Sequence, residues 1–273
     1  MTRTIGGILT TAGLLMLAGL IFEFYGSALI AQHSQEGLLL GFKAAAQTTV
    51  LGLPTVTAAE GTPVALLSIP RLGVTQLVVE GSSAADLESG PGHLSVSPMP
   101  GEFGNSVILG RRTTWGAPLR DLNLLRSGDR VAVTTGQGSF NYVVRTVGRV
   151  GVDDVGPLSG TLDSRLTIVT SDPPYLFTGR LVVVAMLQGQ PVAVATRNPP
   201  TVTAADLGLG FNPLWLAPTF VFLQLLIGAI WLMGRMRRRY WPASVTYMFA
   251  GPTIVALTMA TVMTLDRALP GTM

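Results

Sequence analysis

Three long apolar runs frame a central region of shorter ones. The long runs cover residues 5–30, 214–233 and 244–265. Each has enough residues to cross a hydrocarbon core about 30 Å thick at about 1.5 Å per helical residue. The pattern therefore predicts three transmembrane helices, one near the N-terminus and two near the C-terminus.

The first apolar run is typical of an uncleaved membrane anchor. Phe22, Phe24 and Tyr25 lie near its far end, where aromatic side chains favour the membrane interface, and Glu23 among them is expected at headgroup depth. A secretory signal peptide would have a shorter apolar core followed by a small-residue cleavage site. We therefore predict an anchor over residues 1–32.

The central region has the pattern of an all-β domain. Short runs rich in Val, Ile, Leu and Thr alternate with Gly and Pro, as in strands joined by turns. The predicted strands are residues 65–69, 75–79, 106–109, 130–134, 138–149, 166–170 and 181–187. Ser83 and Asp86 are expected to cap a short helical turn, and residues 118–125 to form another. About 125 residues with this many strands predict a closed or nearly closed β-barrel.

The pattern divides the chain into seven segments. They are the anchor (1–32), a stalk and linker (33–63), the barrel (64–190), a second linker (191–212), a second transmembrane helix (213–234), a basic loop (235–242) and a third transmembrane helix (243–267).

Charge predicts how these segments are oriented. Only 12% of the residues are charged and 48% are hydrophobic, whereas a soluble domain has about 25% charged residues. Arg235, Arg237, Arg238 and Arg239 gather in the basic loop, and positively charged loops stay cytoplasmic. We expect a multi-pass plasma-membrane protein with the N-terminus and this loop inside and the barrel and C-terminus outside. The arginines are also suited to lipid headgroups.

Composition excludes several kinds of chemistry. A net charge of +3, with the basic residues concentrated in one loop, argues against nucleic-acid binding. The absence of cysteine excludes disulfides, thiolate metal sites and a cysteine nucleophile. His33 and His93 are the two histidines, which leaves little for a histidine metal site. We predict no metal and no cofactor, and for Asp153 and Asp154 a solvated turn rather than a Ca²⁺ loop.

One strand end stands out as a place for chemistry. The predicted strand 166–170 stops at Ser171-Asp172-Pro173-Pro174. A residue just before a proline-fixed turn is held rigidly at a sheet edge. Ser171 therefore occupies a position suited to a nucleophile or a ligand contact.

The motifs of the central region resemble those of a known family. They are Ser68-Ile-Pro-Arg-Leu-Gly-Val74, Val78-Val-Glu-Gly81, Gly90-Pro-Gly-His93, Pro100-Gly-Glu-Phe-Gly-Asn105 and Arg112-Thr-Thr-Trp-Gly-Ala-Pro-Leu119. In this order they resemble the sortases, and most of all the class E sortases of actinobacteria. The resemblance covers about residues 65–187 and extends to the anchor and stalk. It implies an eight-stranded all-β sortase barrel.

The resemblance also implies where catalysis would take place. Sortases cut a sorting signal and transfer its acyl group to an amine of the cell envelope, using a Cys nucleophile, a His proton handler and an Arg that stabilises the oxyanion. Aligned motif to motif, the Cys position is Ser171, the His position is Arg111, and the Arg is retained as Arg180. Two of the three catalytic groups are absent.

Ser171 has no obvious base. Arg111 stays protonated, and His93 lies in a turn that sortases share while using another histidine. Asp172 is expected to form an ion pair with Arg111 or Arg180 that fills the old site. The sequence therefore predicts a pseudoenzyme.

The predicted role is an accessory or structural subunit of a bacterial envelope complex for transport, secretion or wall assembly. Its partners would be other membrane or envelope proteins and the lipid bilayer. The barrel would bind them, and the candidate cleft is lined by Arg111, Arg112, Trp115, Asp172, Tyr175 and Arg180. Two alternatives stay open: a serine-dependent acyltransferase or hydrolase using Ser171, and a stand-alone receptor for a peptide or glycan.

Overall fold

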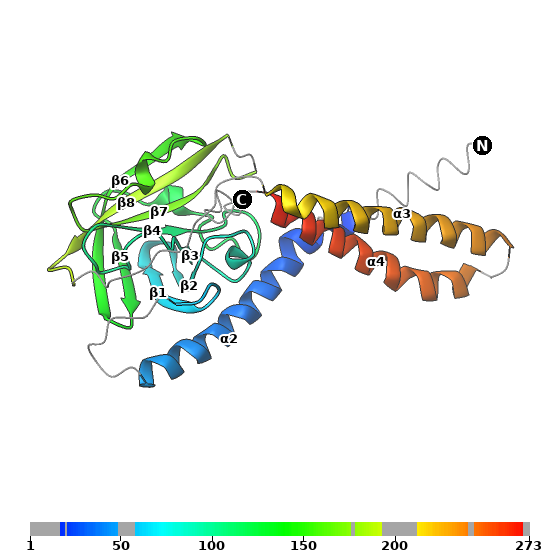
Figure 1. Cartoon of the computed structure of the whole chain (residues 1–273), viewed down its shortest axis with the longest axis horizontal. Coiled ribbons are helices and arrows are strands. Elements are labelled where there is room, and N and C mark those ends of the chain that lie inside the picture. Colours follow the sequence, from blue (N-terminus) through cyan, green and yellow to red (C-terminus); the bar gives the residue numbers. More distant parts are fainter. Residues whose placement is uncertain are drawn as a thin grey trace. The chain divides into compact units, whose positions relative to one another are not determined.

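The computed structural model describes residues 17–19, 21–48, 58–175, 178–192, 212–239 and 243–269. The chain forms two compact units. One comprises Met1–Gly26 and Phe211–Leu269, and the other Ser27–Gly210 with Pro270–Met273. The second unit contains the barrel (Figure 1).

The strands are β1 (Pro63–Ile69), β2 (Val74–Glu80), β3 (Gly92–His93), β4 (Asn105–Leu109), β5 (Arg130–Thr135), β6 (Gly138–Gly151), β7 (Arg165–Asp172) and β8 (Gly179–Gln188). The helices are a π-helical turn (Phe22–Gly26), α2 (Ser27–Thr48), α3 (Leu216–Arg239) and α4 (Ala243–Ala268). Short 3₁₀ turns cover Pro70–Leu72, Asp86–Glu88, Leu122–Leu124, Gly156–Leu158 and Pro213–Trp215.

The strands close into a barrel in the order β1-β2-β3-β4-β7-β8-β6-β5. β2–β3 and β4–β7 are parallel pairs, and the other neighbours are antiparallel. The predicted eight-stranded barrel is thus confirmed. The strand that the periodicity missed is β3, because its two residues are too few to show alternation.

Two hydrophobic clusters explain why β4 and β7 are buried along most of their length. Ile108 of β4 and Ile168 of β7 point into the barrel core, whereas Leu109 and Val169 belong to a second cluster outside it. Strands that are covered on both faces lose the polar half of the alternation. This double burial holds the end of β7, where Ser171 lies, in a rigid setting.

Helix α2 runs beside β1 and β2 as part of the barrel unit (Figure 1). Ser27 and Ala31 are buried, at 0% and 5% exposure. The anchor boundary predicted at residue 32 therefore falls inside α2, where Ser27 and Ala31 pack on protein while Leu29 and Ile30 are exposed.

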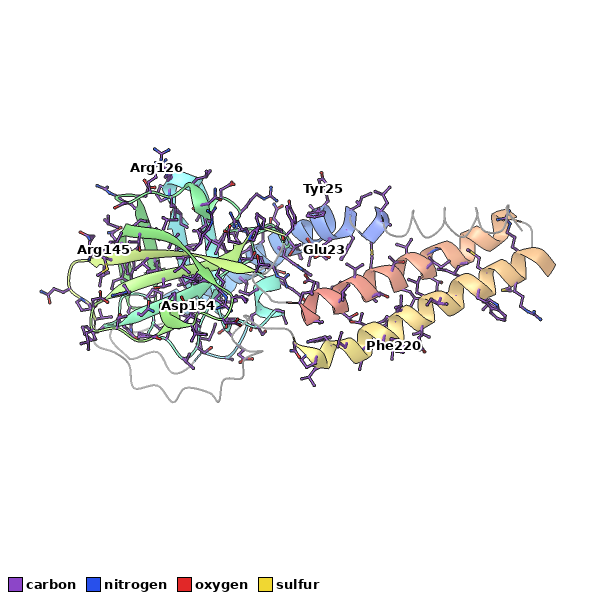
Figure 2. All side chains as sticks on the ribbon, turned by 90° about the horizontal axis from the view of Figure 1, so that it is seen from above. Glu23, Tyr25, Arg126, Arg145, Asp154 and Phe220 are labelled. Atoms are coloured by element: carbon purple, nitrogen blue, oxygen red, sulfur yellow. The ribbon has the colours of Figure 1, made fainter. Side chains whose placement is uncertain are left out.

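The other unit contains α3 and α4, which pack side by side (Figure 1). Within the described ranges, Pro213–Arg237 is the one helix long and apolar enough to cross a membrane. Its Phe220 and Trp231 are 61% and 66% exposed, and Phe220 points outward (Figure 2).

The sequence predicted three spans, and the described residues provide one candidate. Most of the first predicted span, residues 1–16 and 20, lies outside the described residues. The third corresponds to α4, whose first side chains also lie outside them. The three-span arrangement therefore stays a prediction.

A substitution at Gly92 would show how closely β3 packs against the backbone at Gly81. A Cβ at Gly92 would lie 2.1 Å from the Gly81 carbonyl oxygen, a backbone atom that cannot move aside. Gly92→Ala should therefore lower the free energy of unfolding by about 3 kcal/mol. Gly136→Ala, where nothing lies within 4 Å, is the matched control. Equal thermal unfolding temperatures for the two variants would contradict this packing.

Candidate functional site

Ser171 lies within β7 and is paired with Arg180 on the neighbouring antiparallel strand β8. Both side chains are closed off from solvent, with exposures of 2% for Ser171 and 5% for Arg180. The Ser171 hydroxyl oxygen is buried and has no hydrogen-bond partner. A serine nucleophile needs an adjacent base, and none stands within hydrogen-bond distance of this hydroxyl in the described part of the chain.

Arg111 follows β4 and is fully buried. Its Nη1 donates to Thr114 Oγ1 at 3.1 Å, and its Nη2 donates to the Ala84 carbonyl at 2.9 Å. The guanidinium also lies over the Trp115 ring, 5.7 Å from its centroid. Arg111 therefore braces the turn after β4, where the family pattern would have a histidine handling protons.

Asp172 pairs with two arginines, neither of them a predicted partner. Its Oδ1 accepts from Arg112 Nη1 at 2.5 Å, and its Oδ2 lies 2.5 Å from Arg149 Nε. The expectation of a pair with Arg111 or Arg180 was wrong, because Arg111 is turned toward Thr114.

Arg112 also holds the chain beside the nucleophile position. Its Nη1 donates to the Ser171 carbonyl at 2.7 Å, and its Nη2 donates to Asn123 Oδ1 at 3.0 Å. The Arg112 side chain is 5% exposed. The contacts of Arg112 with Ser171 and Asp172 are called here the Arg112 clamp.

Arg180 is the residue that the sequence predicted for oxyanion stabilisation. Burial holds the pKa of Arg180 below its usual range, and the charges of Asp153 and Asp154 oppose this shift. Its Nη1 donates to the Asp154 carbonyl at 3.4 Å. The two aspartates therefore face Arg180, and no group of three or more His, Asp or Glu suited to a metal occurs among the described residues.

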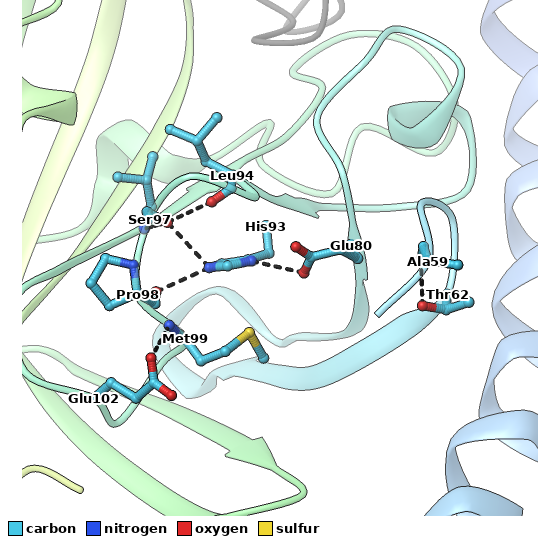
Figure 3. Close-up of polar contacts among 10 residues, drawn as sticks. Ala59, Thr62, Glu80, His93, Leu94, Ser97, Pro98, Met99 and Glu102 are labelled. Carbon is cyan, nitrogen blue, oxygen red and sulfur yellow. Dashed lines mark hydrogen bonds and ion pairs between the residues drawn. The ribbon is translucent and has the colours of Figure 1, made fainter. Parts of the chain in front are cut away.

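His93 belongs to a separate buried network (Figure 3). Its Nδ1 lies 2.9 Å from Glu80 Oε2, and its Nε2 lies 3.1 Å from Ser97 Oγ. The order Ser97–His93–Glu80 has the connectivity of a hydrolase triad. The three side chains are nevertheless 6%, 0% and 3% exposed, so they do not face a substrate.

The hydrogen bonds of this network are inconsistent with base catalysis. His93 Nε2 lies 3.0 Å from the Pro98 carbonyl, which can only accept a hydrogen bond, so this nitrogen serves as a donor there. The Ser97 hydroxyl donates to the Leu94 carbonyl at 2.8 Å and accepts from Val107 N at 3.1 Å. The network joins β2, β3, β4 and the segment between β3 and β4. Both ring nitrogens of His93 are bonded within it and not to Ser171.

The two predicted aromatic contacts differ in exposure. Trp115 is 3% exposed and its backbone N–H donates to Ser27 Oγ at 3.0 Å, so it packs within the protein. Tyr175 is 65% exposed.

In α3, Arg235 lies over Trp231 at 5.8 Å, and Arg237 is exposed. The side chains of Arg238 and Arg239 lie outside the described residues.

Sequence reasoning missed Arg149, Glu80 and Ser97. Glu80 had a signal, because a carboxylate at the end of an apolar strand needs a buried partner. Arg149 had none, since β6 meets the end of β7 only through β8.

The closed eight-stranded barrel, with Arg180 of β8 opposite Ser171 of β7, corresponds to one known kind of domain. Residues 67–188 match the family model described as the sortase domain. This part of the chain is therefore similar to a sortase domain, and the chain contains no cysteine.

Known sortases show how far the similarity extends. Sortase D of Bacillus subtilis is 31% identical over 114 residues, covering 42% of this chain and 56% of that protein. Sortase SrtE1 of Streptomyces coelicolor is 29% identical over 202 residues, covering 67% of this chain and 56% of that protein. The chain thus spans about half the length of the curated relatives it matches. A solved Clostridium perfringens sortase D5 transpeptidase is 27% identical, with a TM-score of 0.51, covering 57% of this chain and 99% of that one.

The two arginines that contact Asp172 differ in burial, so removing Asp172 and removing Arg149 should destabilise the protein by different amounts. Asp172→Ala leaves the buried Arg112 without its carboxylate and should cost about 3 kcal/mol of unfolding free energy. Arg149 is 72% exposed, so Arg149→Ala should cost less than about 1 kcal/mol. Denaturant unfolding of the full-length protein in detergent measures both, and similar costs would rule out the clamp as the dominant contact.

The His93–Glu80 pair predicts strong coupling. His93→Ala and Glu80→Ala should each cost about 3–5 kcal/mol, because each leaves a buried polar or charged partner unpaired. The double variant should cost little more than either single one. A double-mutant cycle of unfolding free energies checks this, and additive costs would show that the two residues act independently.

Proposed function

We propose that this protein is a catalytically inactive sortase-domain membrane protein that serves as an accessory or structural subunit of a bacterial cell-envelope complex. The observation that carries the proposal is the chemistry at the two replaced positions. Ser171 has a hydroxyl without a hydrogen-bond partner, and Arg111, which stays protonated, is bonded to Thr114 and Ala84. Acyl transfer needs an activated nucleophile, and these two residues do not form one.

Exposed residues near the old site favour protein binding. Tyr175 follows β7 in the chain, and Val155 lies in the loop that Arg180 contacts through Asp154. Tyr175 and Val155 are 65% and 56% exposed. Tyr175 is in the loop that joins β7 to β8, and Val155 follows Asp154, so both loops border the Ser171–Arg180 pair. Clustered exposed apolar side chains mark interaction surfaces. Ser171 and Arg180 are buried, so we propose that the partner binds the exposed residues around them, Tyr175 and Val155, which are called here the rim.

The proposed topology keeps the barrel outside the plasma membrane on three spans, with the N-terminus and the basic loop in the cytoplasm. The apolar span Pro213–Arg237 and the exposed Arg235 and Arg237 at its end support this arrangement. Three spans would offer lateral surface to other membrane proteins. The process served would be transport, secretion or wall assembly.

An activity assay tests the catalytic half of the proposal. Purified full-length protein should neither cleave nor transfer sorting-signal peptides above background, and Ser171→Ala should leave that background unchanged. Because the Ser171 hydroxyl makes no hydrogen bond, the variant should also retain wild-type stability. Turnover that is lost in Ser171→Ala, or labelling of Ser171 by a fluorophosphonate, would instead establish serine-dependent acyl transfer.

Site-specific crosslinking tests the binding half. A photoreactive amino acid at Tyr175 should crosslink a defined envelope or membrane protein in cells. The same probe at Arg145, which projects from β6 away from this rim (Figure 2), is the matched control. Equal crosslinking at both positions, or none at Tyr175, would contradict the rim as the binding surface. A crosslinked peptide or glycan without a protein would favour the receptor alternative.

A further inference from the structure

Helix α2 docks on the barrel through one face. Ser27, Ala31 and Gln35 are spaced four residues apart, so they lie on the same side of the helix. Ser27 and Ala31 are buried, whereas Leu29 and Leu40 are 69% and 72% exposed. The helix therefore has a barrel-facing side and an outward side.

The side-chain amide of Gln35 binds the backbone of the barrel much as a neighbouring strand would. Its Nε2 donates to the carbonyls of Leu77 at 3.1 Å and Ser89 at 2.6 Å, and Leu77 N donates to its Oε1 at 2.8 Å. Gly90 leaves room for this amide, because a Cβ there would lie 2.3 Å from Gln35 Nε2. One side chain thus makes three hydrogen bonds that fix the helix to the barrel, two to Leu77 of β2 and one to Ser89 after the turn Asp86–Glu88.

The N-terminal end of α2 supports the turn after β4. Ser27 Oγ accepts from Trp115 N at 3.0 Å, and Ala31 Cβ lies 3.8 Å from where a Cβ on Gly116 would be. Trp115 has a φ of 53° and Ala117 a φ of 45°. Residues other than glycine adopt such angles only where neighbouring contacts hold them. Helix α2 supplies contacts of this kind.

The same turn carries both arginines of the site. The Arg111 guanidinium lies over the Trp115 ring. Arg112, which follows Arg111 in the chain, contacts Ser171 and Asp172 in the Arg112 clamp. Contacts therefore run without a break from α2, through the turn, to the end of β7. Coupling between distant elements travels through chains of packed and hydrogen-bonded groups of this kind.

We propose that α2 is a releasable strap on the barrel. While it is docked, it holds the turn of residues 111–119 and so keeps the Arg112 clamp in place. When it is released, the turn loosens and the clamp opens. This coupling goes beyond the proposed function and does not depend on whether the barrel binds a partner.

Hydrogen exchange of the full-length protein in detergent tests the strap. In Gln35→Ala the amides of residues 113–119 should exchange about tenfold faster than in wild type, as expected for an allosteric coupling of ordinary size. Ser27→Ala should act in the same direction. Gln32→Ala is the matched control, because Gln32 is an exposed glutamine of the same helix, and it should exchange as wild type does. Strands β5 and β6 should be unchanged in every variant.

The reverse experiment uses the reciprocity of coupling. Asp172→Asn weakens the clamp, and the amides of residues 30–40 should then exchange faster by a similar factor. The proposal is overturned if Gln35→Ala speeds exchange in α2 and leaves residues 113–119 at the wild-type rate. It is also overturned if β5 and β6 accelerate equally, since that would be global destabilisation.

Discussion

The buried ion pair between Arg112 and Asp172 is the interaction on which the rest of the site depends. It joins the turn after β4 to the end of β7, two segments that are distant in sequence and adjacent in the barrel. A buried charge has to be paired, so each partner fixes the position of the other. The same Arg112 nitrogen also donates to the Ser171 carbonyl at 2.7 Å, so the pair fixes the backbone at Ser171 as well.

Burial explains why several polar residues of this sortase-like domain stabilise the structure. The Ser97–His93–Glu80 network has the connectivity of a triad, yet its hydroxyl proton is directed at the Leu94 carbonyl. Arg111 likewise bonds to Thr114 and the Ala84 carbonyl. Each group satisfies backbone or side-chain partners that would otherwise be costly to bury.

Helix α2 connects this site to the part of the chain that precedes the barrel. Ser27, which supports Trp115, directly follows the π-helical turn Phe22–Gly26 in sequence. This contact joins the helix that precedes the barrel to the turn that carries Arg111 and Arg112.

The amino-acid pattern predicted the barrel, the ends of seven of its strands to within two residues, and Ser171 and Arg111 in place of the Cys and His that the resemblance implies. Strand alternation and turn residues are local signals, and the identity of a side chain is independent of the fold. Which charges meet depends on the tertiary structure. Arg111 and Arg112 are adjacent in sequence, but the backbone after β4 turns one toward Thr114 and the other toward Asp172. Arg149 reaches Asp172 through the register of three strands, and Gln35 reaches β2 because a helix packs on the barrel. These contacts depend on distances between segments, which no local pattern in the chain encodes.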